Sequence, residues 1–393
     1  MKLKSNSSPL LTTTLFVLIL ISGCTNETNR KEPLLSNDAI EIKLDSIKHL
    51  DKNKSVISEV SYVKLELNDE SIIGEVDKIR YLNSRFYIFD KSVTKSVFVF
   101  SNSGKYLYKI ARLGKGPGEY IFAMDFDVDT LGNIYVYDNA RDRLLKYGTT
   151  GDFIKEYDTG TYLEEFLLGE DERMIVRNAY KNGPDITANL GIINLKNQHL
   201  ETFFKGGEIQ DNFDIPRFSS HYLFKSDNNI YYYARFTNNI YKISNNKISK
   251  SIIFEPHLFP PDELISKIKK DMKVIFENFE NNTYLFDIRD IFENSEFVIL
   301  KYKKMRDFIL LISKATEHKT IFSTLKDKNY FGENMIYGVA DGKFISIIKP
   351  ISLNKKWHER VDSSELKLNI KTQLHEINTN SNPTICFIKF KEF

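Results

Sequence analysis

A repeat of four short strands constrains the fold of this chain more than any other feature of its sequence. In the first copy, an aromatic strand ends on Asp90, and a hairpin turn follows at Gly104. The second copy has the same landmarks at Asp138 and Gly151, which lie 48 and 47 positions further along. Because the register holds at both landmarks, each copy predicts one four-stranded antiparallel sheet.

Weaker copies of the repeat follow, and they bring the number of predicted sheets to six. They lie at residues 164–205, 221–253, 284–325 and from 335 onward. A sheet of this kind cannot bury both of its faces alone, whereas a closed ring of sheets buries the faces and removes free edges. The prediction is therefore an all-β fold, a six-bladed β-propeller of four-stranded antiparallel blades that spans residues 55–393.

Ring closure is predicted to use both ends of the propeller sequence. Two strand-like runs remain outside the repeats, at residues 61–67 and 385–390, and both are assigned to the final blade. One inserted α-helix is predicted at about residues 260–280. Pro260-Pro261-Asp262 is a good helix start there, and apolar residues follow at three- and four-residue spacing.

The composition agrees with a strand-rich fold and argues against one class of partner. The chain has 29 Phe and 21 Tyr, and aromatic residues suit a pleated, half-buried surface. Lys and Arg number 55 against 53 Asp and Glu, a formal net charge of +2, which provides no strong positive field for a polyanion. We therefore predict no nucleic-acid partner, and we expect a monomer of 393 residues.

The N-terminus has the layout of a secretory signal. A basic start and an apolar stretch over residues 10–21, too short to span a bilayer, precede Ser22-Gly23-Cys24. Residues 21–24 resemble the lipobox of bacterial lipoproteins, which implies removal of residues 1–23 and lipidation of Cys24. The alternative is an ordinary signal peptide with an incidental cysteine. The polar residues 24–54 are predicted to form a tether, partly ordered near its end.

A glycine-rich segment carries a resemblance to a known family. Residues 112–120 read Arg-Leu-Gly-Lys-Gly-Pro-Gly-Glu-Tyr and resemble the Gly-x-Gly-Pro-Gly-Glu-Tyr signature of the six-bladed β-propeller lipoproteins of Bacteroidetes. The resemblance includes the lipobox, the repeat spacing and the last strand, and it fades in repeats three to five. It implies an exported, membrane-tethered propeller similar in architecture to NHL-repeat proteins. No catalytic residue is carried over.

Three aspartates form a candidate metal site. Asp125, Asp127 and Asp129 alternate along a predicted strand, so their carboxylates share one face. The EF-hand pattern fails because Thr130 stands at the glycine position and Val136 at the glutamate position. Solvated carboxylates at a strand end are favoured over a divalent cation near the central channel, and no other cofactor is predicted.

Two further candidates are a recognition cluster and a cysteine. Trp357, His358 and Arg360 combine the sole tryptophan with histidine and arginine on a predicted loop, a composition suited to binding. Cys386 lies in an apolar run and is predicted to be buried in a strand rather than to act as a catalytic thiol. The glycines of residues 114–118 match neither a P-loop nor a dinucleotide motif and predict a tight turn between blades.

The functional prediction rests on architecture. A propeller tethered to the cell envelope, at the outer membrane on its periplasmic or surface side, is expected to bind or scaffold a small molecule, glycan or protein. The alternative is a metal-dependent hydrolase or lactonase, which would need several acidic or histidine side chains converging at the channel. A structural role in the envelope is third. An enzyme is not favoured, and the ligand stays open.

Overall fold

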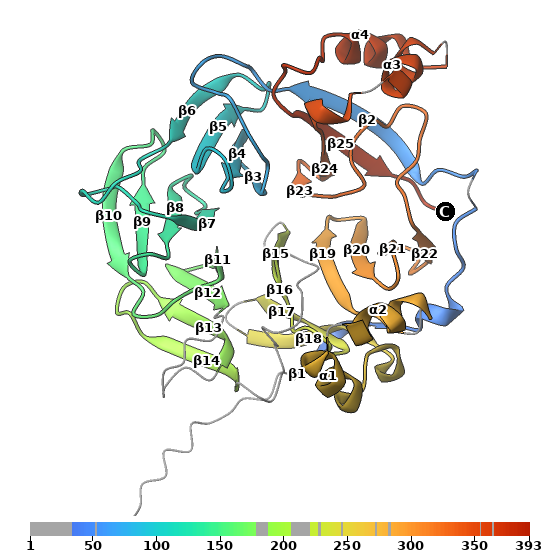
Figure 1. Cartoon of the computed structure of the whole chain (residues 1–393), viewed down its shortest axis with the longest axis horizontal. Coiled ribbons are helices and arrows are strands. Elements are labelled where there is room, and N and C mark those ends of the chain that lie inside the picture. The colour runs from blue at the N-terminus through green and yellow to red at the C-terminus, as the bar shows by residue number, and fades with distance from the viewer. Residues whose placement is uncertain are drawn as a thin grey trace, which may run out of the picture. The chain divides into compact units, whose positions relative to one another are not determined.

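Six β-sheets surround a common centre, which confirms the predicted six-bladed β-propeller (Figure 1). The structure is a computed structural model that describes residues 34–51, 53–177, 188–205, 221–226, 229–244, 247–271, 273–281, 284–353, 355–363 and 365–393. The predicted signal peptide, residues 1–23, and Cys24 lie outside the described residues.

Five blades take their strands in chain order from the centre outward (Figure 1). Blade 1 contains β3 (Lys78–Leu82), β4 (Arg85–Asp90), β5 (Ser96–Ser101) and β6 (Tyr106–Ile110). Blade 2 contains β7 (Ala123–Val128), β8 (Ile134–Asp138), β9 (Arg143–Tyr147) and β10 (Phe153–Asp158). Blade 3 contains β11 (Glu165–Leu168), β12 (Arg173–Arg177), β13 (Ala188–Asn194) and β14 (Leu200–Lys205). Blade 4 contains β15 (Leu223–Ser226), β16 (Asn229–Tyr233), β17 (Asn239–Ser244) and β18 (Lys247–Phe254). Blade 5 contains β19 (Asp287–Glu293), β20 (Phe297–Lys303), β21 (Asp307–Ser313) and β22 (Lys319–Phe322).

The repeated aspartate and glycine have structural roles. The buried carboxylate of Asp90 accepts hydrogen bonds from the backbone N–H groups of Gly74 at 2.8 Å and Val93 at 2.8 Å, so it joins the connection before blade 1 to the turn within it. Asp138 does the same in blade 2. Gly104 has φ +85°, a conformation that glycine adopts without steric cost. The repeat therefore marks the turns that hold neighbouring blades together.

The sixth blade closes the ring with strands from both ends of the propeller, as predicted. It contains β23 (Gly338–Ala340), β24 (Lys343–Ile348), β25 (Thr384–Phe390) and, outermost, β2 (Ile57–Lys64). Strands β2 and β25 are antiparallel, with Tyr62 opposite Cys386. Cys386 is fully buried, as its apolar flanks predicted, and burial raises the pKa of its thiol.

The predicted tether differs from the structure in its second half. Residues Leu34–Ile42 form β1, which pairs in parallel with β18 and makes blade 4 five-stranded. Ile42 and Leu44 are buried, so the alternating apolar residues at positions 40–44 cover the outer part of this blade. A 3₁₀ turn, η1 (Leu44–Ser46), follows. Residues 24–33 and 52 of the predicted tether lie outside the described residues.

Four helices are described, where the sequence predicted one insertion with a single helix. The segment near residues 260–280 contains two helices, α1 (Asp262–Lys270) and α2 (Lys273–Glu280), with an extended residue at Asp271 between them. Helices α3 (Lys355–Asp362) and α4 (Leu368–His375) were not predicted and lie between β24 and β25. Each of these has eight residues, too few for a clear helical periodicity in the sequence.

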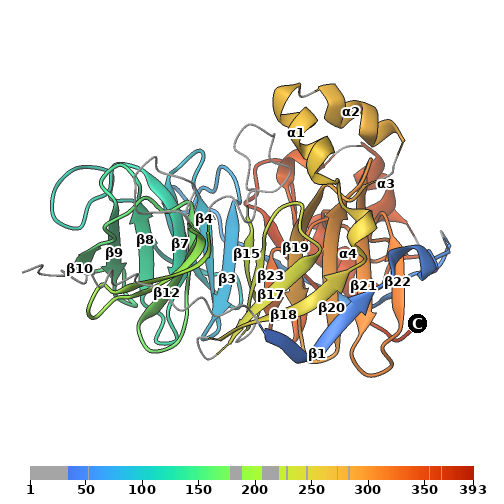
Figure 2. The same ribbon diagram turned by 90° about the horizontal axis from the view of Figure 1, so that it is seen from below.

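The elements outside the blades are short. Two 3₁₀ helices, η2 (Pro256–Leu258) and η3 (Pro350–Ser352), follow β18 and β24. Helices α1 and α2 lie on one face of the ring, seen at the top of Figure 2, whereas α3 and α4 lie at the outer edge of the ring beside the sixth blade (Figure 1). None of the helices in the described ranges is both long enough and apolar enough to cross a membrane.

Candidate binding site in the central channel

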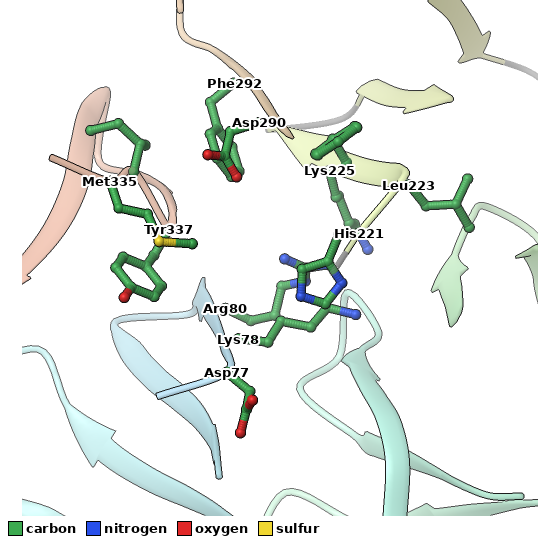
Figure 3. A pocket seen from close by; sticks show the side chains of 12 residues that line it. Asp77, Lys78, Arg80, His221, Leu223, Lys225, Asp290, Phe292, Met335 and Tyr337 are labelled. Atoms are coloured by element: carbon green, nitrogen blue, oxygen red, sulfur yellow. The ribbon is translucent and has the colours of Figure 1, made fainter. Parts of the chain in front are cut away.

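The innermost strands of blades 1, 4 and 5 place charged side chains around one cavity. Alternate residues of a strand point to the same side, so Lys78 and Arg80 of β3 lie together on one side of the cavity, and Lys225 of β15 points toward them (Figure 3). The cavity volume is about 30 Å³, which is room for a few water molecules at most. Its lining is completed by Asp77, His221, Leu223, Phe224, Asp290, Phe292, Met335, Ile336 and Tyr337.

The basic side of the cavity is held by two aspartates of blade 2. The Lys78 Nζ atom donates to Asp125 Oδ1 at 2.7 Å, and Arg80 Nε donates to Asp127 Oδ1 at 2.7 Å. Lys225 Nζ reaches Asp127 Oδ2 at 3.1 Å from blade 4. Burial alone would raise the pKa of Asp127, but the charges of Lys225, Arg80 and Lys78 hold it well below its usual range.

The other side of the cavity carries Asp290, whose carboxyl group points into the space between the basic side chains and Tyr337 (Figure 3). This half-buried carboxyl group has no hydrogen-bond partner among the described residues. Burial raises the pKa of Asp290 to about 7, although Lys301 and Arg289 act to lower it. Asp290 can therefore exchange a proton near neutral pH.

A second buried ionic cluster adjoins the cavity through His221. Arg177 of β12 pairs with Glu164 and with Glu165 Oε1, the latter at 3.1 Å, and His221 Nδ1 lies 3.7 Å from Glu165 Oε2. The backbone N–H of Tyr222 also donates to Glu165 at 2.9 Å. These contacts fix the start of β15, so they position His221 at the edge of the cavity.

The predicted metal residues are brought together only in part. Asp125 and Asp127 are buried side by side on β7, but their oxygens bind Lys, Arg and backbone N–H groups. Asp129 lies beyond the strand and caps a turn by accepting from the backbone N–H groups of Leu131 and Asn133. Within the described ranges, no three His, Cys, Asp or Glu side chains are arranged to hold a metal ion.

The predicted recognition cluster is on helix α3 instead of on a loop. Trp357 is buried and packs edge-on against Phe331 at 5.9 Å, and the guanidinium group of Arg360 lies 4.3 Å from the centre of the same ring. Arg360 also donates to the carbonyl of Tyr330 at 2.9 Å. Two of the three side chains therefore attach the helix to its own blade, and His358 is exposed.

The glycine-rich segment is a turn between blades 1 and 2, as predicted. The N–H group of Gly116 donates to Glu119 Oε2 at 2.8 Å, and the hydroxyl of Tyr147 donates to the carbonyl of Gly118 at 3.0 Å. A Cβ atom on Gly118, where φ is +72°, would approach the Phe153 ring to 2.6 Å. The segment therefore needs its glycines for chain geometry and packing.

The channel residues were missed, although one signal for them exists in the repeat spacing. Lys78 and Asp125 are 47 positions apart, and so are Arg80 and Asp127. The repeat therefore places two basic residues of one inner strand beside two acidic residues of the next. His221 and Asp290 occupy no such matched positions, because blades 4 and 5 keep only faint repeat landmarks.

Comparison with known protein families identifies the group to which this architecture belongs. The profile of a domain of unknown function, DUF4934, matches residues 39–389, which span the propeller from β1 to the last strand. The chain belongs to the DUF4934 family. No curated protein sequence matches the chain.

Two solved structures show the same fold as this DUF4934 protein. A Bacteroides fragilis NCTC 9343 protein that is named as an exported protein shares 20% identity, with a TM-score of 0.72 over 90% of this chain and 99% of that chain. A member of the DUF4221 family from Bacteroides vulgatus ATCC 8482 shares 12% identity, with a TM-score of 0.52 over 86% of this chain and 98% of that chain. At these identities the likeness concerns the fold alone.

Proposed function

We propose that this DUF4934 protein is an exported, membrane-tethered binding module that takes its ligand at the central channel. The observation that carries the proposal is the cavity between β3, β15 and β19, where hydrogen-bonding groups from three blades converge. Ligand sites in proteins combine an apolar lining with a few convergent polar groups. Phe292 and Met335 supply the apolar part here, and Lys78, Arg80 and Asp290 supply the polar part.

Export and tethering are supported by the sequence before the propeller. The signal-like residues 1–23 are followed by Cys24, and the Bacteroides fragilis protein of the same fold is named as exported. Lipidation adds about 0.8 kcal/mol of membrane affinity for each buried CH₂ group. A lipid on Cys24 would therefore hold the propeller at a membrane surface.

Membrane fractionation tests the tether. Cys24→Ala is expected to move the protein from the membrane fraction to the soluble fraction with its thermal unfolding unchanged. Cys386→Ala is the control, because it removes the other cysteine and leaves the lipidation site intact. Continued membrane association of Cys24→Ala would contradict the anchor.

Crystals soaked with a set of small neutral and charged fragments test the location of binding. Fragments are expected in the channel, against Lys78, Arg80 or Asp290, because this cavity offers buried polar groups beside apolar ones. Fragments that bind at the rim or the outer strands, with the channel empty, would contradict the proposed site.

An acid–base enzyme is the second candidate function. The specific observation is that Asp290, with a pKa of about 7, faces the same cavity as the imidazole of His221. Groups that titrate near neutral pH suit proton transfer. Asp290→Asn would separate the two functions, since an enzyme would lose its turnover, whereas a binding module would show only a change in ligand affinity. The metal-dependent hydrolase lacks support because Asp125 and Asp127 bind cationic side chains.

A further inference from the structure

The basic side of the channel cavity has more hydrogen-bond donors than acceptors. The guanidinium of Arg80 has five N–H groups, of which Nε donates to Asp127 and Nη1 to the carbonyl of Ile79 at 3.3 Å. Lys78 uses one of its three N–H groups, on Asp125. Lys225 uses two, on Asp127 and on the carbonyl of Leu168. Several donors therefore have no acceptor among the described residues.

Two of these three side chains are largely shielded from water, which makes an acceptor valuable, whereas that of Lys225 is 23% exposed. The side chain of Lys78 is 8% exposed and that of Arg80 is 13% exposed. A buried donor without an acceptor costs free energy, and the cost is larger for a charged group. Burial lowers the pKa of Lys78 even with Asp125 beside it. An additional acceptor at this position would stabilise all three basic side chains.

The balance of charge favours an acceptor that is itself negative. Lys78, Arg80 and Lys225 face two carboxylates of blade 2, those of Asp125 and Asp127, so the basic side of the cavity has one cation in excess. Asp77 and Asp290 are the other carboxyl groups of the lining. Charged donors bind ionised oxygens about twice as strongly as neutral ones. Arginine adds a planar pair of N–H groups that matches two oxygens of one carboxylate or phosphate.

We infer that the cavity is a binding site for the oxyanion group of a small ligand, a carboxylate or a phosphate, held by Lys78, Arg80 and Lys225. This inference rests on the proposed function, because it names the ligand class of the same site. A volume of about 30 Å³ admits the head group alone. Phe292 and Met335 also line the cavity, so a ligand with an apolar part next to its oxyanion group suits it.

Asp290 makes the site dependent on pH. Ionised, it repels an oxyanion, whereas its protonated form can donate a hydrogen bond to one. The charged and titratable groups around it come from every neighbouring element: Lys78 and Arg80 of β3 with Asp77 before it, His221 and Lys225 at β15, Arg289 of β19, Lys301 of β20, Asp307 of β21 and Tyr337 before β23. Oxyanion binding is therefore strongest at pH values at which Asp290 keeps its proton.

Calorimetric titration of the full-length protein tests this site with two probes, acetate and inorganic phosphate, at constant ionic strength. Either probe is expected to bind, and the probe that binds more tightly identifies the oxyanion class. Lys225→Gln is the main variant, because Asp127 keeps Arg80 as a partner and the fold is therefore expected to be preserved. It is expected to weaken binding about ten-fold or more, and Arg80→Gln at least as much. Acetate is expected to bind more weakly at pH 8 than at pH 6, and Asp290→Asn to remove that difference.

A matched control and two outcomes decide the result. Arg143→Gln alters an ion pair with Asp158 on the outer strands of blade 2 and is expected to leave probe binding unchanged. Binding that is equal in Lys225→Gln, Arg80→Gln and Arg143→Gln, or an effect matched by sodium chloride, would overturn the oxyanion site. Neutral fragments in the channel with no binding of either probe would overturn it too, while leaving the proposed function intact.

Discussion

The inner strands of blades 2 and 5 both carry buried carboxylates, and the two strands leave them in opposite states. On β7, the charges of Lys225, Arg80 and Lys78 outweigh burial and hold the pKa of Asp127 well below its usual range. On β19, burial prevails and raises the pKa of Asp287 and of Asp290 to about 7. The charges of Arg235 near Asp287 and of Lys301 near Asp290 lower these two pKa values, but not enough to return them to the usual 3.8.

The difference shows that partners, and not burial, decide the charge of a carboxylate in this channel. Asp127 receives donors from blades 1, 3 and 4, including the backbone N–H of Leu168 at 2.7 Å. Asp290 receives none among the described residues. Hydrogen bonds to the ionised form stabilise it, and desolvation without them favours the neutral form. Asp127, with its partners, thus fixes structure, whereas Asp290 is free to respond to pH or ligand.

Opening the ring is expected to have the largest effect, because it exposes the inner strands β7 and β19 to water. Truncation after Asn382 removes β25, including the buried Ile385, Ile388 and Phe390. Each such side chain contributes about 1.5–3 kcal/mol, and folded domains have about 5–15 kcal/mol in total. The truncated protein is expected to lose its cooperative thermal unfolding, measured by circular dichroism.

A deletion at the other end is the control for ring closure. Removal of residues 25–33 leaves β1 and the six blades complete, so the melting temperature is expected to stay close to that of the full chain. If the C-terminal truncation melted like the full-length protein, β25 would not be needed for the closed ring.

Asp127→Asn tests the carboxylate that has cationic partners and is expected to have the next largest effect. The substitution leaves Arg80 and Lys225 buried without their shared carboxylate, and loss of one partner of a buried ion pair costs about 3–5 kcal/mol. Urea unfolding at pH 7 measures the change. Asp158→Asn is the matched control, because Asp158 pairs with Arg143 at 2.6 Å but is 51% exposed, and such pairs contribute about 0–1 kcal/mol. Equal losses in the two variants would mean that the channel pair is no stronger than a surface pair.

Asp290→Asn tests the carboxyl group that lacks a partner, through the pH dependence of stability. With its pKa raised from 3.8 to about 7, folded Asp290 keeps a proton that the unfolded chain has released. The free energy of unfolding therefore falls as pH rises from about 4 to 7, by about 1–3 kcal/mol for a half-buried group. Asp290→Asn is expected not to show this fall in the free energy of unfolding, because an asparagine side chain does not release a proton.

Urea unfolding at pH 5 and pH 8 separates the outcomes for Asp290. At pH 5 the variant is expected to be only slightly more stable than the original protein, and at pH 8 the variant is expected to be more stable by the full margin. Asp287 contributes to the slope in both proteins, so the difference between them isolates Asp290. A variant that is less stable at pH 8 would show that the carboxylate has a stabilising partner.

The repeat made the blades predictable, because each blade depends on contacts close in sequence. Ring closure also followed, since two strand-like runs were left over after six repeats. The parallel pairing of β1 with β18 was not predictable in this way, because it joins residues 34–42 to strand residues more than 200 positions away. The helices α3 and α4 had too few apolar residues to reveal their period.

Part of the channel site could be predicted from the sequence, and part of it could not. The spacing of 47 between Lys78 and Asp125 follows the repeat and predicts that they lie side by side. The approach of Lys225 to Asp127 crosses 98 positions and depends on how the ring closes. The surroundings of two candidate metal residues were hidden for a related reason, because the cations that pair with Asp125 and Asp127 come from other blades.

The smallest effect is expected for Asp129→Asn, two positions after Asp127 on the same face of the chain. Asp129 caps a turn, and its Oδ1 atom accepts from the backbone N–H groups of Leu131 at 3.0 Å and Asn133 at 2.9 Å. An asparagine oxygen can keep both bonds, so the loss is limited to contacts of Oδ2: the 3.6 Å ion pair with Lys146 and the hydrogen bonds from Asn133 Nδ2 and, at 3.3 Å, from the Tyr135 hydroxyl. We expect destabilisation of less than about 1 kcal/mol in urea unfolding at pH 7. A loss of stability as large as that of Asp127→Asn would contradict the comparison. It would mean that the turn capped by Asp129 stabilises the fold as much as the ion pairs of Asp127 with Arg80 and Lys225.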